Sequence, residues 1–171
     1  MTIRTADLND IPELLLLINS AYRGEVSKKG WTTEADLVSG DLRTDEGNLN
    51  ELMQLPDAGF LVYQSEIKSI AGCVFFQQRE PGKMYFGMLS VSPDYQAEGI
   101  GKKLMKALDE YSIEKNCKVI SMRVISIRKE LIDWYKRLDY YETGEKQAFP
   151  TGPFGTAMIP LEFVVMQKDI L

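Results

Sequence analysis

One stretch, Gly87 to Tyr111, constrains the fold of this chain more than any other. It reads GMLSVSPDYQAEGIGKKLMKALDEY, with an apolar run suited to a buried strand, a break at Ser92-Pro93-Asp94, and then a helical pattern. The apolar residues after the break recur at helical spacing, at Ile100, Leu104, Leu108 and Tyr111. The stretch therefore predicts a strand that leads through a glycine-bearing turn into a helix, which begins at or just before Gly99.

The predicted turn is suited to bind phosphate. The first turn of a helix leaves several backbone N–H groups without helical partners, and the helix dipole makes that end positive. Gly99 and Gly101 lack the Cβ atoms that would hold a bulky anion away from these N–H groups. The alternative is an ordinary strand-to-helix turn in which the glycines serve tight packing.

Two widespread phosphate-binding motifs do not fit this turn. A Walker loop requires a glycine where this chain has Gln96, and a serine or threonine where it has Lys103. The dinucleotide-binding fingerprint requires a third glycine where this chain has Leu104. The turn therefore belongs to neither class.

The pattern Q-x-x-G-x-G after a V-x-P strand end resembles the GNAT superfamily of N-acetyltransferases. The resemblance implies that main-chain N–H groups from Gln96 to Lys102 bind the pyrophosphate of acetyl-coenzyme A. It also implies that the strand Leu89 to Val91 pairs its backbone with the pantetheine arm, and that N–H groups near Leu89 support the oxygen of the reacting carbonyl. The residues expected to contact the cofactor are Leu89, Ser90, Val91, Gln96, Ala97, Glu98, Gly99, Ile100, Gly101, Lys102 and Arg128.

A second stretch, RKELIDWYKRLDYYETGE, is similar to the family's second motif, a short helix that carries a tyrosine. Tyr135 stands where the family has its general acid, and a phenol suits this role because it is protonated at neutral pH. From spacing alone, Tyr135 shares a helix face with Leu131 and Leu138, which is also typical of a packed core aromatic. Several positions depart from the family pattern: Arg128 replaces a frequent asparagine, Leu131 an alanine, and Asp139-Tyr140 a Gly-Phe pair. These departures concern secondary contacts to the cofactor.

The remaining sequence predicts a single domain over residues 1–171, with a mixed α/β fold. A central twisted sheet of about seven strands, mostly antiparallel and flanked by helices, is expected, with a parallel crossover between Met84 and Val124. The expected strands are Thr2 to Ala6, Gly59 to Glu66, Ile67 to Glu80, Lys83 to Val91, Lys118 to Val124, Tyr140 to Phe149 and Glu162 to Lys168. The expected helices are Asp10 to Tyr22, one that contains Glu34, Leu37 and Val38, one around Leu49 to Leu55, the helix after Gly99, and Arg128 to Leu138.

The region between the first helix and the second strand is expected to line the acceptor side, as the resemblance implies. Residues 24–31 read as a loop, and Thr32 or Thr33 as the cap of the following helix. Tyr22, Trp31 and Arg43, together with Phe149, Phe154 and the loop from Pro150 to Pro160, are candidates to wall an acceptor pocket, although each aromatic is also typical of simple packing under loops.

No general base is assigned from the sequence. Some members of the family carry a glutamate in the register of Tyr85, and no carboxylate lies between Lys83 and Val91 here, so Tyr85 is kept as a substrate-side candidate. Glu25, Glu34 and Asp36 lie in the acceptor region, but they read as solvated surface charges, and a water wire is an equal alternative.

Composition excludes several kinds of chemistry. The chain has no histidine, which rules out Ser-His-Asp and Cys-His nucleophiles and removes the commonest zinc ligand, so no metal is expected. The net charge of −5 disfavours nucleic acid as a partner. Cys73 and Cys117 read as reduced structural thiols, and the run from Leu14 to Ile18 is too short to span a bilayer, so we expect a cytoplasmic protein without membrane contact.

The resemblance implies an enzyme that moves an acetyl group from acetyl-coenzyme A to the primary amine of a small molecule or amino-acid-like acceptor by direct attack. The departures at Arg128 and Asp139 motivate an alternative, a non-catalytic coenzyme A or acyl-CoA sensor or scaffold. The oligomeric state, monomer or homodimer, is left open.

Overall fold

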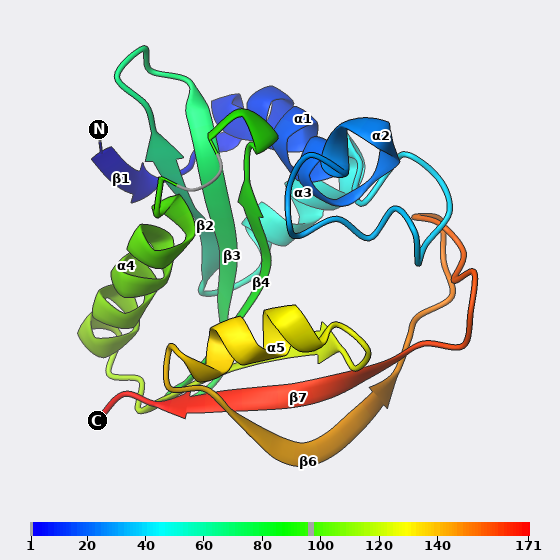
Figure 1. The fold of residues 1–171 in the computed structure, drawn as a ribbon. Coiled ribbons are helices and arrows are strands. Elements are labelled where there is room, and N and C mark those ends of the chain that lie inside the picture. The colour runs from blue at the N-terminus through cyan, green and yellow to red at the C-terminus, as the bar shows by residue number, and fades with distance from the viewer. Residues whose placement is uncertain (1, 96–97) are drawn as a thin grey trace.

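A twisted sheet of seven strands organises the computed structural model, which describes residues 2–95 and 98–171 (Figure 1). The strands are β1 (Thr2–Thr5), β2 (Ala58–Gln64), β3 (Ile70–Glu80), β4 (Lys83–Val91), β5 (Val119–Ile125), β6 (Tyr141–Ala148) and β7 (Glu162–Asp169). The helices are α1 (Ile11–Tyr22), α2 (Gly24–Ser27), α3 (Glu46–Gln54), α4 (Ile100–Glu114) and α5 (Lys129–Lys136), with 3₁₀ turns at Leu8–Asp10 and Pro93–Tyr95.

The sheet is mixed, as the sequence predicts. Its strand order is β1-β2-β3-β4-β5-β7-β6, and β4 with β5 is the parallel pair among strands that otherwise run antiparallel. Helix α4 provides the crossover between these two strands, because parallel neighbours cannot be joined by a tight turn. The predicted fold class is confirmed.

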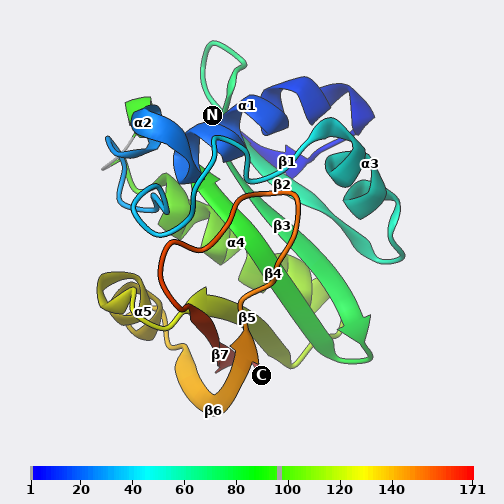
Figure 2. The same ribbon diagram turned by 90° about the vertical axis from the view of Figure 1, so that its right-hand side faces the viewer.

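Strands β4 and β5 are paired only at one end. Their register covers Lys83–Tyr85 against Val119–Ser121, and beyond these residues the two strands diverge (Figure 2). Strand β4 also carries one extra residue, because Cys73 of β3 faces Ser90 whereas Phe75 faces Gly87. Such a bulge bends a strand and increases its twist, so it moves the end of β4 away from β5.

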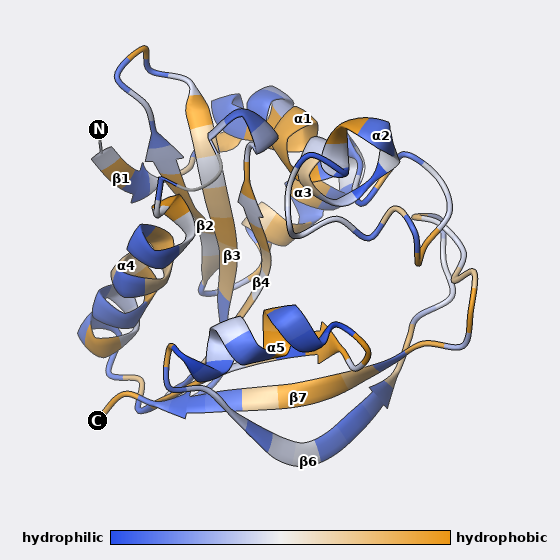
Figure 3. Ribbon diagram, viewed as in Figure 1, coloured by the Kyte–Doolittle hydropathy of each residue, from blue (hydrophilic) through white to orange (hydrophobic). Residues whose placement is uncertain are grey.

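Each face of the sheet is covered by different helices. Helices α4 and α5 pack on one face through residues such as Leu104, Leu108 and Ile132, and α1 and α3 pack on the other through residues such as Leu14 and Leu49. Figure 3 shows the apolar side of α4 turned toward the sheet and its charged side turned away from it. The opening between β4 and β5 therefore connects two separately packed halves of the core.

The predictions for the segment between α1 and α3 were wrong in detail. Residues 24–27 form the short helix α2 where a loop was expected. Residues 32–38 make a single turn and not a helix, since Leu37 and Val38 both donate their N–H groups to the carbonyl of Glu34 and Val38 then pairs with Ala157 as a β-bridge. A partner far along the chain thus overrides the local helical pattern.

Helix α3 begins at Glu46, three residues before the expected Leu49. It begins there because the Asp45 carboxylate accepts a hydrogen bond from the N–H of Asn48.

Within residues 2–95 and 98–171, the helices are all too short or too polar to cross a bilayer.

Candidate functional site

The phosphate-binding end predicted from the sequence lies at the beginning of α4. Gly99 occupies the cap position with a φ of 73°, the left-handed conformation that glycine adopts without strain, and Ile100 is the first helical residue. The first helical hydrogen bond runs from the N–H of Lys103 to the carbonyl of Gly99, at 3.1 Å. The N–H groups of residues 100–102 therefore have no helical acceptor and lie at the positive end of a helix of 15 residues. Gln96 and Ala97, also expected to contact the cofactor, lie outside the described residues.

The two glycines of this turn serve different purposes. A Cβ at Gly99 would meet nothing within 4 Å, so conformation alone favours glycine there. A Cβ at Gly101 would lie 3.5 Å from the ring of Trp134, which is an ordinary van der Waals contact. Gly101 also lies within α4, where other residues adopt the same backbone conformation. Glycine at 101 is therefore not required by packing, and the prediction that it admits an anion remains a prediction.

A cavity of about 290 Å³ opens where β4 and β5 diverge. Its lining comes from both faces of the sheet: residues 85–89 of β4, 122–125 of β5, Leu131 and Tyr135 of α5, Arg128 before α5, Tyr22, Arg23, Glu34, Arg43 and Phe163, and the segment 149–155. Because Tyr135 lies on the α5 side and Tyr22 on the α1 side, the cavity passes between the strands from one side of the sheet to the other.

Tyr135 is buried in the wall of this cavity. Its side chain is 4% exposed, and its ring packs against Phe86, Trp134 and Tyr140 with centroid distances of 5.9, 5.0 and 5.7 Å. Burial raises the pKa of the phenol well above its usual range, and nearby Tyr22 adds to this effect. Tyr135 is thus both a core aromatic and a protonated hydroxyl beside the opening, so the two alternatives left by the sequence are compatible. Its role as the acid stays a prediction.

The two other tyrosines expected on the substrate side also line the cavity. The hydroxyl of Tyr22 donates a hydrogen bond of 2.5 Å to the carbonyl of Leu89, in the distorted part of β4. Burial is the main cause that raises the pKa of Tyr22, and Glu34 raises it further. Tyr85 lines the cavity as well, and the guanidinium of Arg79 lies 3.6 Å from the centroid of its ring.

Trp31, the third substrate-side candidate, does not line the cavity as the structure describes it. Its ring packs on that of Trp134, with centroids 5.0 Å apart, and Trp134 lies beside Gly101 at the beginning of α4. Trp31 therefore lies closer to the predicted phosphate-binding end than to the acceptor side.

Arg128 determines this placement of Trp31. Its buried guanidinium donates from Nη1 to the carbonyl of Thr32 and from Nη2 to the carbonyl of Trp31, both at 3.0 Å. The side chain thus fastens the loop after α2 to the beginning of α5, over a sequence distance of 96 residues. Its predicted contact with the cofactor remains untested, but this structural role was not visible in the sequence.

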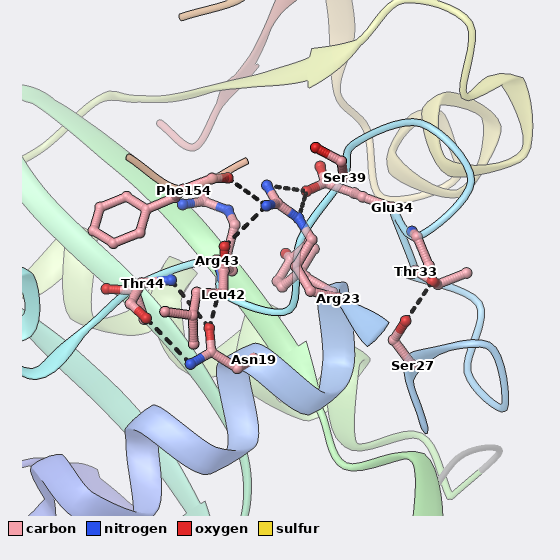
Figure 4. A network of polar contacts seen from close by, with 12 residues as sticks. Asn19, Arg23, Ser27, Thr33, Glu34, Ser39, Leu42, Arg43, Thr44 and Phe154 are labelled. Carbon is pink, nitrogen blue, oxygen red and sulfur yellow. Dashed lines mark hydrogen bonds and ion pairs between the residues drawn. The ribbon is translucent and has the colours of Figure 1, made fainter. Parts of the chain in front are cut away.

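A buried ion pair holds the predicted acceptor side together (Figure 4). Arg23 and Glu34 are 5% and 8% exposed, and Nη2 of Arg23 lies 3.3 Å from Oε1 of Glu34. Nη1 of Arg23 also donates to the carbonyl of Leu42 at 3.0 Å and to the carbonyl of Phe154. One side chain therefore connects α1, the segment before α3 and the segment after β6.

The segment 149–161, here called the closing segment, lies over the opening because it pairs with residues 37–39. The N–H of Ser39 donates to the carbonyl of Thr156 and the N–H of Met158 to the carbonyl of Leu37, each at 2.9 Å. Figure 2 shows this segment crossing in front of β4. Residues 149–155 of this segment line the cavity together with Tyr22 and Arg43, and the expectation that they wall an acceptor pocket stays a prediction.

The three carboxylates considered as bases have different surroundings. Glu25 and Asp36 are exposed and pair with Lys28, as expected for solvated charges. Glu34 was expected to be solvated too, and that prediction was wrong, because the fold buries it against Arg23. The described part of the cavity wall therefore offers no carboxylate free of a cationic partner.

Two charged residues of the cavity lining were not identified as candidates from the sequence. Arg123 sits within the otherwise apolar strand VISMRVI, and a charge in such a run is a usable signal of a special position. Arg23 carries no such signal, since a basic residue after a helix is common. Its partners Glu34, Leu42 and Phe154 are distant in sequence, so only the fold reveals it.

Neither thiol belongs to the site. Cys73 and Cys117 are buried and unbridged, and burial raises the pKa of the Cys73 thiol to about 12. Within the described ranges no three histidine, cysteine or acidic side chains gather closely enough to hold a metal ion.

Comparison with known proteins identifies the family to which this sequence is similar. The sequence matches the model of the acetyltransferase (GNAT) family over residues 18–140. A thialysine N-epsilon-acetyltransferase from Sus scrofa is 30% identical over 76 residues, which are 44% of this chain and 45% of that protein. This match thus spans less than half of the relative's length. An uncharacterized N-acetyltransferase from Archaeoglobus fulgidus is 29% identical over 131 residues, 72% of this chain and 82% of that protein.

A solved structure has a similar fold. The structure of yncA from Salmonella typhimurium, determined with its cofactor acetyl-CoA, superposes with a TM-score of 0.70 at 21% identity, covering 100% of this chain and 94% of the other.

Proposed function

This chain belongs to the acetyltransferase (GNAT) family. From that premise we propose that it moves the acetyl group of acetyl-coenzyme A to the primary amine of a small-molecule or amino-acid-like acceptor, and that the amine attacks the thioester directly. One observation carries the proposal: the cavity between β4 and β5 joins the tyrosine-bearing helix α5 to the side lined by Tyr22, Arg43 and residues 149–155. Its volume of about 290 Å³ suits a small acceptor, since pockets for small molecules begin at roughly 300 Å³.

The residues present fit acetyl-coenzyme A. The N–H groups of residues 100–102 are the ones that would hold its pyrophosphate, and the end of β4 from Leu89 to Val91 is the strand that would pair with the pantetheine arm. The strand edge exists because β5 leaves β4 after Tyr85, so backbone groups beyond that point face the opening. When bound there, the thioester supplies an acetyl group already activated for attack by an amine.

Tyr135 is the residue proposed to manage the protons. As the new C–N bond forms and the C–S bond breaks, its phenol donates a proton to the departing sulfur, and the tyrosinate then takes the proton that the new amide nitrogen loses. Tyr135 thus ends each turnover as a phenol. The ammonium form of the acceptor loses its first proton to water, because the one carboxylate in the described lining, Glu34, is paired with Arg23.

Replacement of the phenol tests this role. In a thiol-release assay, Tyr135→Phe is expected to lower kcat by about 10²- to 10⁴-fold while calorimetry shows acetyl-coenzyme A still bound. Tyr140→Phe is the matched control, because the Tyr140 hydroxyl is buried without a hydrogen-bond partner among the described residues and does not line the cavity. Normal turnover by Tyr135→Phe contradicts the assignment.

The pH profile gives a second test. Because burial raises the pKa of Tyr135 above 10, the acid form persists as pH rises, whereas the acceptor amine becomes more reactive. The value of kcat/KM is therefore expected to rise with pH, and no decrease is expected until the pH exceeds about 10. Binding of acetyl-coenzyme A without acetylation of any amine in a broad library supports the sensor alternative instead.

A further inference from the structure

The cavity has a charge opposite to that of the whole protein. The chain carries a net charge of −5, yet the charged residues that line the cavity are four arginines, at 23, 43, 123 and 128, and one acid, Glu34. An excess of positive charge inside a concave site of an acidic protein attracts an anionic group of a ligand.

The guanidinium groups of two of these arginines already bind partners within the protein. Arg23 pairs with Glu34 and donates to two carbonyls, and Arg128 donates to the carbonyls of Trp31 and Thr32. Arg123 is exposed, donates to the side-chain oxygen of Gln147 at 3.2 Å and lies 4.3 Å from the centroid of the Phe163 ring. These three side chains have evident structural contacts.

Arg43 differs from the other three. Its side chain is partly buried, and its guanidinium lies 5.7 Å from the centroid of the Tyr22 ring. Within residues 2–95 and 98–171 this guanidinium makes neither an ion pair nor a hydrogen bond, whereas that of Arg123 bonds to Gln147. It also lies near a second cation, since Arg43 is one of the groups that lower the pKa of Arg23. Of these two neighbouring guanidinium groups only that of Arg23 pairs with Glu34, the one acid of the described lining, so the positive charge of Arg43 is uncompensated there.

The backbone around Arg43 is held firmly in place. The side-chain oxygen of Asn19 on α1 accepts hydrogen bonds from the N–H groups of Arg43 and Thr44, at 2.6 and 3.0 Å, and its nitrogen donates to the carbonyl of Thr44 (Figure 4). A side chain with an unpaired charge on a fixed backbone is arranged as a binding group. A solvated surface arginine needs no such support.

We propose that Arg43 binds a carboxylate of the acceptor, so that this protein acetylates a small amine that carries a carboxylate, such as an α-amino acid. The inference rests on the proposed function. The planar guanidinium presents donors in a fork that matches a carboxylate, which favours this anion over a bulkier one in a cavity of about 290 Å³. Arg43, Tyr22 and Tyr135 all line the cavity, and the Arg43 guanidinium lies over the Tyr22 ring, so an acceptor bound to Arg43 shares this cavity with Tyr135.

The test compares paired acceptors in a thiol-release assay. Each pair consists of a common α-amino acid and the amine that differs from it only by loss of the carboxylate. Because the amino groups of the two have different pKa values, each rate is divided by the concentration of the deprotonated amine before the two are compared. The carboxylated member is expected to be the better substrate. Arg43→Met is expected to raise its KM by about tenfold to a hundredfold, and to leave the KM of the partner amine unchanged. Arg43→Lys should recover part of the loss.

A matched variant and a binding assay separate the possible failures. Arg137→Met removes the same charge from an exposed position outside the cavity lining and is expected to change neither KM. The inference is overturned if no carboxylated amine is acetylated, if both members of each pair respond alike to Arg43→Met, or if Arg43→Met weakens acetyl-coenzyme A binding in calorimetry and not acceptor binding. Failure of the unaltered protein to bind acetyl-coenzyme A, by contrast, refutes the proposed function itself.

Discussion

The two sides of the opening between β4 and β5 are built in different ways. The cofactor side consists of the end of β4 and the beginning of α4, which belong to one stretch of chain, residues 87–114. The acceptor side joins residues that are far apart, since the contact from Arg23 to Phe154 spans 131 residues and that from Thr156 to Ser39 spans 117. One side is a local backbone structure, and the other is assembled by side-chain and main-chain contacts between distant segments.

This difference has a physical consequence. A helix end and a strand edge bind through main-chain N–H and C=O groups, which every residue supplies, so few sequence positions are constrained. A buried ion pair between distant segments depends on both partners at once, and loss of one leaves the other charged and buried. We therefore expect the acceptor side to be more sensitive to substitution than the cofactor side.

The largest effect on stability is expected for Arg23→Met. This change leaves Glu34 buried without its cationic partner and leaves the carbonyls of Leu42 and Phe154 without their donor, at a cost of about 3–5 kcal/mol. Urea unfolding measures it, with Arg137→Met as the exposed control. Because the loss comes from the unpaired acid, adding Glu34→Gln should restore part of it. A loss of the size seen for Arg137→Met contradicts the contrast between the two sides.

Gly155→Ala is expected to be the next most harmful change. A Cβ at Gly155 would lie 2.2 Å from the carbonyl oxygen of Ser39 and 2.8 Å from Nη1 of Arg23, in a residue whose φ is +97°. Overpacking and the left-handed conformation together cost about 2–4 kcal/mol. Gly144→Ala separates the two causes, because Gly144 has a φ of +88° with nothing within 4 Å of the added Cβ, and it should lose about 1–2 kcal/mol. Equal losses in thermal unfolding would show that the clash has no effect.

Substitutions at the beginning of α4 are expected to be milder. Gly99→Ala keeps open space around the new Cβ but forces a left-handed alanine, at a cost of about 1–2 kcal/mol. Gly101→Ala lies inside the helix and is expected to be neutral or to stabilise by up to about 1 kcal/mol. Calorimetry with acetyl-coenzyme A sharpens the comparison: weaker binding by the stable Gly101→Ala variant supports direct contact of the phosphate with this turn, and unchanged binding removes Gly101 from the site.

The smallest loss of stability is expected where the two sides meet. Tyr22→Phe removes the hydrogen bond to the carbonyl of Leu89 and should cost about 1 kcal/mol in unfolding free energy. Because the same hydroxyl lies in the cavity wall, we expect a higher KM for the acceptor with acetyl-coenzyme A affinity unchanged. A change in acetyl-coenzyme A affinity of the same size as the change in acceptor KM would show that the two sides are not separate at this point.

Prediction from sequence succeeded where the signal is local. The strand, turn and helix from Gly87 to Tyr111, the parallel crossover and the helix that carries Tyr135 all follow from periodicity, glycine placement and apolar runs within short windows. The prediction of a helix around Glu34, Leu37 and Val38 was wrong because Val38 pairs with Ala157. A prediction from the residues next to Val38 in sequence cannot include that partner. The placement of Trp31 was missed for the same reason, since Arg128 holds it from 97 residues away.

The candidate site divides along the same line. Tyr135, Tyr22, Tyr85 and the cofactor turn were named from the sequence, whereas the pairing of Arg23 with Glu34 and the unpaired state of Arg43 were not. Whether an arginine is free or occupied depends on which carboxylates and carbonyls lie within a few ångströms of it. Composition and spacing do not contain that information.

The sequence by itself determined the family of this chain, its mixed sheet and the beginning of α4, because backbone hydrogen bonding and helix geometry depend on residues close along the chain. Only the tertiary structure decided how far β4 and β5 diverge, which face of the opening the closing segment covers, and which cavity arginine has neither an ion pair nor a side-chain hydrogen bond among the described residues. These features depend on distances between segments that are separated along the chain, by more than a hundred residues where the closing segment contacts Arg23 and Ser39. Such distances exist only once the whole chain has folded.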